Sequence, residues 1–228
     1  MFMLAGNATY AGPADLPQTV PLFPLTGAVL LPKAQMPLNI FEPRYLAMVD
    51  AALRGDRLIG MIQPDFSISG VEQAEKPPLV GIGCLGRIVA YQETGDGRCL
   101  VTLTGVTRFA LSEELETVTP YRMGRISVED FAVDFETGEG EDDVDRDGLV
   151  SALRTYLDAN DLEADWDSID RASTEVLVNA LSMMSPYGPA EKQALLEAPD
   201  LRTRADTLVA LTEVDLAKKQ GDDGVTLQ

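Results

Sequence analysis

The sequence contains no histidine among its 228 residues. Histidine is the general base of Ser-His-Asp triads and a common ligand of zinc and haem iron, so its absence excludes the His-dependent forms of these sites. The sequence also has no Gly-Lys dipeptide, which excludes a Walker A loop, and no Ser-x-x-Lys spacing. It therefore supports neither ATP hydrolysis nor serine-type proteolysis.

Cysteine and long apolar runs are also scarce. Cys84 and Cys99 are the only cysteines, too few for a disulfide framework. No stretch approaches the ~18 apolar residues of a membrane span, and the segment 1–4 has neither the basic region nor the length of a signal peptide. We therefore expect a cytoplasmic protein, and no residue pattern calls for a cofactor.

Basic side chains are few, and the resulting charge is unevenly distributed. The chain has 18 Lys and Arg against 37 Asp and Glu, a net charge of −19. Residues 18–128 carry 10 basic and 11 acidic side chains, net −1, whereas residues 129–228 carry 8 and 25, net −17. A chain this acidic repels the phosphate backbone of nucleic acids, and the sequence contains no basic patch that would favour binding to them.

The charge contrast divides the chain into segments. We predict a flexible N-terminal tail (1–17), a β subdomain (18–128), an acidic linker (129–147), a helical subdomain (148–217) and a C-terminal tail (218–228). The linker holds ten acidic residues and one arginine. Charge this dense does not bury an apolar face, so we expect a solvated, partly flexible connection.

The first half is typical of a mostly β module. Short β-rich runs are separated by Pro and Gly, over residues 19–25, 28–31, 36–40, 57–63, 79–93, 98–104, 106–111 and 121–128. A hairpin centred on Gly95-Asp96 would place Cys99 opposite residue 92, with Cys84 too far along the strand for a disulfide. One helix interrupts the strands, from Pro43 to Gly55.

The second half has the helical period. One apolar stripe runs from Leu149 to Leu157 and a second from Ile169 to Met184. A third helix should begin near Pro189 and stop before Pro199, and a fourth should run from about Asp200 to Lys219. The pattern predicts a helical bundle with acidic outer faces.

Three sequence motifs resemble functional sites. Gly81-Ile-Gly-Cys-Leu-Gly86 matches a dinucleotide fingerprint, but a β pattern follows it, so we interpret the glycines as residues of a crowded strand. Asp143 to Gly148 resembles the start of an EF-hand loop, yet position 12 is Arg154, which favours an acidic helix N-terminus over a cation site. Acidic residues also crowd Trp166, which we expect to anchor a solvated loop.

Residues 20–45, VPLFPLTGAVLLPKAQMPLNIFEPRY, resemble the opening of the substrate-binding N-terminal domain of ATP-dependent Lon proteases. The specific features are the spacing of Pro24, Pro32 and Pro37 and the run Ile40-Phe-Glu-Pro-Arg-Tyr45, and weaker matches extend to about residue 215. The resemblance implies an α+β fold: a PUA-like pseudo-barrel β subdomain followed by a C-terminal helical bundle. It also implies recognition of polypeptides. The ATPase and Ser-Lys peptidase modules are absent from the sequence, so we expect a stand-alone, non-catalytic form.

Our leading hypothesis is a module that binds exposed or unfolded polypeptide segments, as an adaptor in ATP-dependent proteolysis or protein quality control. The candidate contacts are aromatic and methionine side chains: Phe41, Tyr45, Met48, Met183, Met184 and Tyr187. Such stripe residues also suit a core. We interpret Glu42, Arg44, Gly105 and Arg108, which lie in the family motifs, as structural. The alternatives are a PUA-like RNA-binding protein and an accessory subunit of a Lon-type peptidase.

Overall fold

The computed structural model describes residues 2–68 and 76–223, with side chains described to residue 219 of the last helix. The chain divides into two compact units. The barrel unit comprises Met1–Thr137 and Pro186–Leu196, and the helical unit comprises Gly138–Ser185 and Glu197–Gln228. No helix within the described residues is long and apolar enough to cross a membrane.

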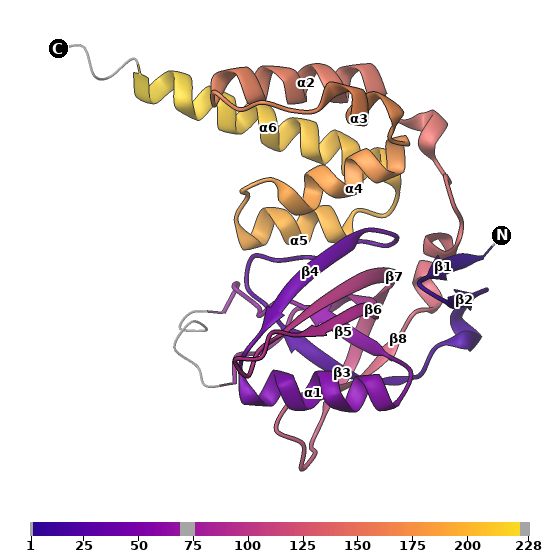
Figure 1. The fold of residues 1–228 in the computed structure, drawn as a ribbon. Helices are drawn as coiled ribbons and strands as arrows, with labels where there is room; N and C mark the ends of the chain where they lie inside the picture. The colour runs from indigo at the N-terminus through magenta and orange to yellow at the C-terminus, as the bar shows by residue number, and fades with distance from the viewer. Residues whose placement is uncertain (1, 69–75, 224–228) are drawn as a thin grey trace. The chain divides into compact units, whose positions relative to one another are not determined.

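The barrel unit is built on a six-stranded sheet of order β4-β7-β6-β5-β3-β8 (Figure 1). Its strands are β3 (Thr19–Pro24), β4 (Gln35–Ile40), β5 (Leu58–Ile62), β6 (Ile82–Glu93), β7 (Cys99–Leu115) and β8 (Arg122–Ser127). Because β7 pairs with β8 as well as with β6, five strands close into a ring and β4 is attached through β7. The predicted pseudo-barrel and α+β class are confirmed.

The long strand β7 replaces two predicted strands, 98–104 and 106–111, and runs without a break through Gly105. A Cβ atom on Gly105 would lie 2.0 Å from the Leu31 carbonyl oxygen, and the Lys33 N–H donates to the Gly105 carbonyl at 2.8 Å. Gly105 is thus required by the close approach of a crossing segment and does not end a strand.

That crossing segment, residues 28–31, was predicted as a strand but is a buried loop. Val29, Leu30 and Leu31 are at most 2% exposed, so their apolar run reflects core packing outside the ladder. Leu30 packs against Gly86 of β6, where an added Cβ would lie 2.7 Å away. Gly83 and Gly86 of the dinucleotide-like motif therefore belong to a crowded strand, as predicted, whereas Gly81 precedes β6 and has open space around it.

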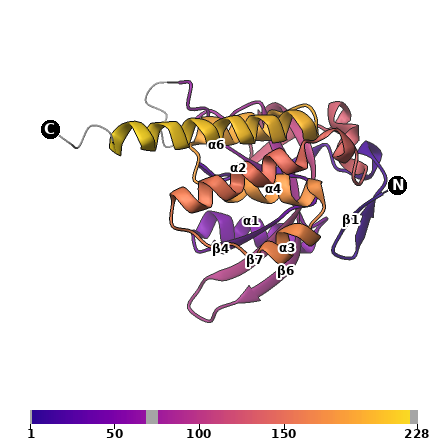
Figure 2. The same ribbon diagram turned by 90° about the horizontal axis from the view of Figure 1, so that it is seen from above.

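The β6–β7 hairpin projects from the barrel (Figure 2) and differs from the prediction by one residue of register. Cys99 pairs with Glu93, not with residue 92. The loop is centred on Asp96, whose carboxylate accepts the Arg98 N–H at 3.2 Å. Cys84 and Cys99 are both free and buried.

Helix α1 (Pro43–Arg54) has the predicted bounds and lies across one end of the barrel (Figure 1). Pro43 occupies the first turn, where its missing N–H is not needed, and the Gly55 N–H closes the last turn on the Ala52 carbonyl. Tyr45 and Met48 are among the residues that the helix buries. Local sequence signals and packing agree here.

The N-terminal residues are more ordered than the predicted tail. Strands β1 (Met3–Ala5) and β2 (Ala8–Tyr10) form a hairpin, followed by the short helix η1 (Pro13–Asp15). Met3, Ala5 and Tyr10 are buried in the same cluster as Phe109 of β7. The burial of these side chains explains why the segment differs from a free tail.

The predicted acidic linker begins with the short helix η3 (Glu129–Phe135), which packs on β7. Asp134 accepts hydrogen bonds from the Arg108 guanidinium at 2.8 Å and from the Arg108 backbone N–H at 2.8 Å. The two side chains are 6% and 3% exposed, respectively. This part of the segment is therefore buried, because the arginine satisfies the carboxylate.

Helix α5 (Pro189–Glu197) returns to the barrel unit over residues 186–196. The buried Gln63 amide donates to the Pro189 carbonyl and to the Gln193 side chain, both at 3.0 Å. Gln193 in turn donates to the Ile82 carbonyl at 3.0 Å. These bonds tie a segment late in the sequence to strands β5 and β6.

The remaining helices form the helical unit: η4 (Glu141–Asp143), α2 (Arg146–Ala159), α3 (Trp166–Arg171), α4 (Thr174–Met184) and α6 (Leu201–Asp223). Helices α2 and α6 lie side by side in both views (Figures 1 and 2). One predicted helix is divided into α3 and α4, because the Ser173 hydroxyl caps α4 by accepting the Val176 N–H. Helix α6 extends into the predicted C-terminal tail, whose residues 224–228 lie outside the described range.

Candidate functional site

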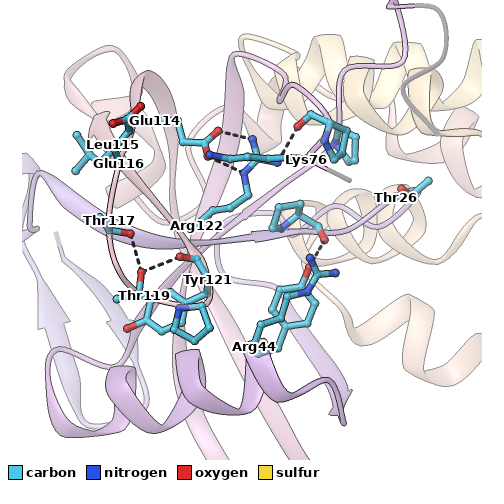
Figure 3. Close-up of a pocket in the computed structure, with 15 residues that line it drawn as sticks. Thr26, Arg44, Lys76, Glu114, Leu115, Glu116, Thr117, Thr119, Tyr121 and Arg122 are labelled. Atoms are coloured by element: carbon cyan, nitrogen blue, oxygen red, sulfur yellow. Dashed lines mark hydrogen bonds and ion pairs between the residues drawn. The ribbon is translucent and has the colours of Figure 1, made fainter. Parts of the chain in front are cut away.

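The barrel unit contains a pocket of about 980 Å³, drawn in Figure 3. Its walls come from the end of β3, the start of α1, the segment after β5, the end of β7 and the 116–121 loop that leads to β8. Four prolines and two tyrosines supply rigid apolar surface: Pro24, Pro64, Pro77, Pro120, Tyr45 and Tyr121. The volume lies at the upper end of the range for ligand sites.

One wall of the pocket is an ion-pair network around Glu114 of β7 (Figure 3). The Arg122 Nε donates to Glu114 at 3.0 Å and its Nη2 makes a second bond to the same carboxylate, while Lys76 Nζ lies 2.5 Å away. Burial alone would raise the pKa of Glu114, but the hydrogen bonds from Arg122 and Lys76 outweigh it and lower the pKa. Glu114 is therefore held as a carboxylate that positions two cations.

The facing wall is built from the start of α1. The Tyr45 hydroxyl donates to the Pro24 carbonyl at 3.5 Å, and the Tyr45 ring packs on Phe23 with centroids 4.3 Å apart. Burial raises the pKa of Tyr45, and the nearby Arg44, whose guanidinium lies 4.5 Å from the ring centroid, opposes that rise. The wall is therefore neutral and aromatic, with one cation at its edge.

The 116–121 loop forms the third side. The Thr117 and Thr119 hydroxyls lie 2.7 Å apart, and Thr119 donates to the Tyr121 carbonyl at 2.8 Å (Figure 3). These bonds fix the loop, while Val118 at its tip is fully exposed. A single exposed apolar side chain is common on protein surfaces, so Val118 by itself does not mark a contact surface.

The predicted contact residues lie in different places. Tyr45 lines the pocket with the small part of its side chain that stays accessible, since the residue is 7% exposed. Met48, on the same stripe, is 0% exposed in the core and is unavailable to a partner. Phe41 is 59% exposed and lies under the Arg98 guanidinium, outside the pocket. Met184 is 81% exposed at the end of α4.

Two further predicted contacts, Met183 and Tyr187, are half-buried. Met183 belongs to the helical unit and Tyr187 to the barrel unit. The six predicted contact residues thus do not form one site within either unit.

The motif residues interpreted as structural make intramolecular contacts. Arg44 pairs with Glu42 at 2.8 Å, and Arg108 holds Asp134 as described above. Gly105 accommodates the crossing segment. Arg44 also lines the pocket, so among these motif residues it is the one placed to contact a ligand there.

No sequence motif contains four residues of the pocket, Glu114, Lys76, Arg122 and Tyr121. They fall in two segments, 76–77 and 114–122, that the sequence presents as ordinary strand ends and turns. The turn Pro120-Tyr121-Arg122 is the one local feature that could have indicated this part of the site. The pairing of β7 with β8 brings the turn next to the other prolines that line the pocket.

The acidic motifs of the helical unit act as helix caps. The Asp145 carboxylate accepts the Gly148 N–H at 2.9 Å and so caps α2, in the motif that resembles an EF-hand loop. Asp165 caps α3 in the same way, and the Arg154 guanidinium lies 3.9 Å from the centroid of the Trp166 ring. Among the described residues, no three or more Asp, Glu or Cys side chains gather where they could hold a metal ion.

Two solved structures similar to this chain are N-terminal domains of Lon proteins. A Lon N-terminal domain protein from Xanthomonas campestris matches with a TM-score of 0.58 and 23% identity, over 84% of this chain and 97% of that chain. The N-terminal domain of the Mycobacterium avium complex Lon protease matches with a TM-score of 0.62 and 16% identity, over 86% and 98%. At these identities the comparison establishes the fold alone.

Curated sequence relatives are Lon proteases. Those from Parabacteroides distasonis and Desulfosudis oleivorans are 30% and 27% identical to this chain, over 84% and 83% of its length. The chain spans 23% of the length of each of these relatives. The family model of the ATP-dependent protease La (LON) substrate-binding domain matches residues 19–213. This chain therefore belongs to the LON substrate-binding domain family.

Proposed function

We propose that this protein binds extended or unfolded segments of other polypeptides through the pocket of the barrel unit, as a non-catalytic recognition module. The observation that carries the proposal is the pocket's rigid lining of four prolines and two tyrosines in a domain of this family. Rigid walls lose little conformational entropy on binding, and aromatic surfaces accept varied sequences. A site of this kind recognises an extended chain without requiring one fixed sequence.

Strand addition to the barrel is a weaker route to the same function. Among the described strands, β4 pairs with β7 alone and so presents one free edge. Pro37 lies in the middle of β4, and proline in a strand is tolerated where its missing N–H faces away from the ladder. The free edge therefore lacks a donor at its centre, which favours the pocket.

The proposed role is to deliver bound polypeptides to ATP-dependent proteolysis in the cytoplasm, as an adaptor or as an accessory subunit of a Lon-type peptidase. Family membership and the polypeptide-binding pocket support this role. RNA binding, the competing hypothesis, receives no support from charge, because the barrel unit carries 11 basic and 17 acidic side chains.

The test measures binding to an unfolded chain by fluorescence anisotropy. The probe is labelled ribonuclease A that is reduced and blocked with iodoacetamide, and the same protein with its disulfides intact is the folded control. We expect the unfolded probe to bind at least about tenfold more tightly than the folded one. Tyr121→Ala should weaken binding about tenfold, as for a typical aromatic contact at an interface.

Phe41→Ala and Met184→Ala are the matched controls, because both remove exposed apolar side chains outside the pocket. Both should bind the unfolded probe as the wild type does. Equal affinity for folded and unfolded probes, or a loss with Phe41→Ala and none with Tyr121→Ala, contradicts the proposal. Tight, salt-sensitive binding of single-stranded RNA in place of the unfolded probe supports the competing function.

A further inference from the structure

We propose that the pocket contains a subsite for an acidic side chain, an Asp or Glu of the bound polypeptide, formed by Arg122 and Lys76. This inference rests on the proposed function and adds a preference to it. The candidate segment is extended, with apolar residues or prolines on both sides of the carboxylate. Three features support the subsite: the unused donors of the two cations, the local charge and the fixed position of Arg122.

The first observation is that the two cations have hydrogen-bonding capacity left over. A guanidinium has five N–H donors, and Arg122 uses two on Glu114 and one on the Pro77 carbonyl at 2.7 Å. The Lys76 ammonium has three donors and contacts Glu114 with one. Within the described residues, two donors therefore remain on each side chain, and both side chains line the pocket.

The second observation is the local charge. One carboxylate, Glu114, faces two cations, which leaves the cluster at +1 in a chain of net charge −19. Elsewhere in the lining, Arg44 is paired with Glu42 and Glu116 is exposed on the adjacent loop, so the positive excess is confined to the cluster of Arg122, Lys76 and Glu114. Because the surrounding surface is acidic, an anionic group is attracted here and repelled elsewhere, which makes the preference local.

The third observation is that Arg122 is held in place before anything binds. Its side chain is 14% exposed and is fixed by Glu114 and by the Pro77 carbonyl. A preordered, partly buried guanidinium loses little entropy on binding and is less screened by salt than a surface charge. Leu115, Pro120 and Tyr121 beside it suit apolar neighbours of the carboxylate.

The test compares labelled ten-residue peptides of alternating leucine and proline, with a central Glu or Gln and both ends blocked. We expect the Glu peptide to bind at least tenfold more tightly than the Gln peptide, because a charge-assisted hydrogen bond replaces a neutral one. A third peptide with the central Gln and a free C-terminal carboxylate tests the other source of the same group. If this third peptide alone binds tightly, the side-chain subsite is wrong and the pocket reads chain ends.

Two variants of the pocket lining should act in opposite directions. Lys76→Gln should weaken the Glu peptide about threefold to tenfold and leave the Gln peptide unchanged. Glu116→Gln removes an exposed carboxylate of the lining and leaves Glu114 in place to order the two cations, so it should tighten binding of the Glu peptide and leave the Gln peptide unchanged. Arg54→Gln, which removes an exposed cation on α1 outside the pocket, is the matched control and should change neither.

The outcomes separate the two proposals. Equal binding of the Glu and Gln peptides overturns the subsite and leaves polypeptide binding intact. If neither peptide binds and the unfolded ribonuclease also fails to bind, the proposed function is wrong and the subsite with it. A change caused by Arg54→Gln equal to that of Lys76→Gln also overturns the subsite, because net charge alone would explain it.

Discussion

The two units of this protein differ in the side chains that they bury and in their net charge. The largest side chains that are less than 2% exposed lie in the barrel unit: Phe109, Leu22, Leu30, Leu31, Met48, Ile59, Met61, Ile62, Leu85, Ile88, Leu103 and Leu195. The helical unit buries fewer apolar side chains, among them Leu149, Val178 and Leu208. The barrel unit also buries an ion pair, Arg108 with Asp134. The helical unit has a thinner core and carries 7 basic and 20 acidic side chains, net −13, against −6 in the barrel unit. The difference indicates that dense packing fixes the pocket, while capping and solvated charge maintain the helices.

The largest effect should come from breaking the buried ion pair. Asp134→Ala leaves the Arg108 charge buried without its carboxylate, and the free energy of unfolding of the barrel unit should fall by about 3–5 kcal/mol. Hydrogen exchange of β7 amides measures this loss. Trp166 fluorescence follows the helical unit, because Trp166 is the only tryptophan.

Asp130→Ala is the control, since it removes an exposed carboxylate from the same short helix. It should change stability by less than about 0.5 kcal/mol. Equal losses of unfolding free energy for Asp134→Ala and Asp130→Ala would mean that the buried ion pair makes no special contribution to the stability of the barrel unit.

A smaller effect should follow from removing a cap in the helical unit. Asp145→Ala deletes the acceptor of the Gly148 N–H at the start of α2, and should cost about 1 kcal/mol. Denaturant titration followed by Trp166 fluorescence measures it. Asp143→Ala, which removes a neighbouring exposed carboxylate, should have less effect; the reverse order would favour a cation-binding role for the acidic motif.

The smallest effect concerns pH and the pocket. The folded pKa of Glu114 lies below its ordinary value of 4.5, so its ion pairs stabilise the barrel unit above about that pH. The contribution is lost as the pH falls through the folded pKa. Because the cluster is partly exposed, we expect less than about 1 kcal/mol.

Carboxyl ¹³C NMR of Glu114 gives the titration directly. The stability difference between wild type and Glu114→Gln should shrink as the pH falls from 7 to 3. A difference that grows on acidification would show that the carboxylate is destabilised in the fold. Glu116→Gln, an exposed carboxylate on the adjacent loop, controls for the change in overall charge.

Elements with local signals were predicted well. Helix α1 was predicted from Pro43 to Gly55, because proline at the first turn, an apolar stripe and a closing glycine lie within one short segment. The Ser173 cap that divides α3 from α4 is equally local but was overlooked, because the apolar stripe continues across it. The predicted apolar stripe also differs from the buried face of α4, because Val176 is 54% exposed and Val178 is fully buried.

Long-range features escaped prediction. Asp134 was assigned to a solvated linker, yet Arg108 lies 26 positions earlier in the sequence and buries it. The pocket combines Pro24, Tyr45, Pro77 and Tyr121, which no local pattern groups together. Of the predicted contact residues, Tyr45 alone lines it.

The sequence by itself determined the change from a β half to a helical half, the bounds of α1, the uneven distribution of charge and the family resemblance, because composition, local periodicity and short motifs carry each of them. The tertiary structure decided which acidic side chains are buried, why Gly105 must lack a side chain, and where the pocket lies. Those properties depend on closure of β7 on β8 and on the segment that crosses Gly105. Both are contacts between distant parts of the chain, and packing, not local periodicity, selects them.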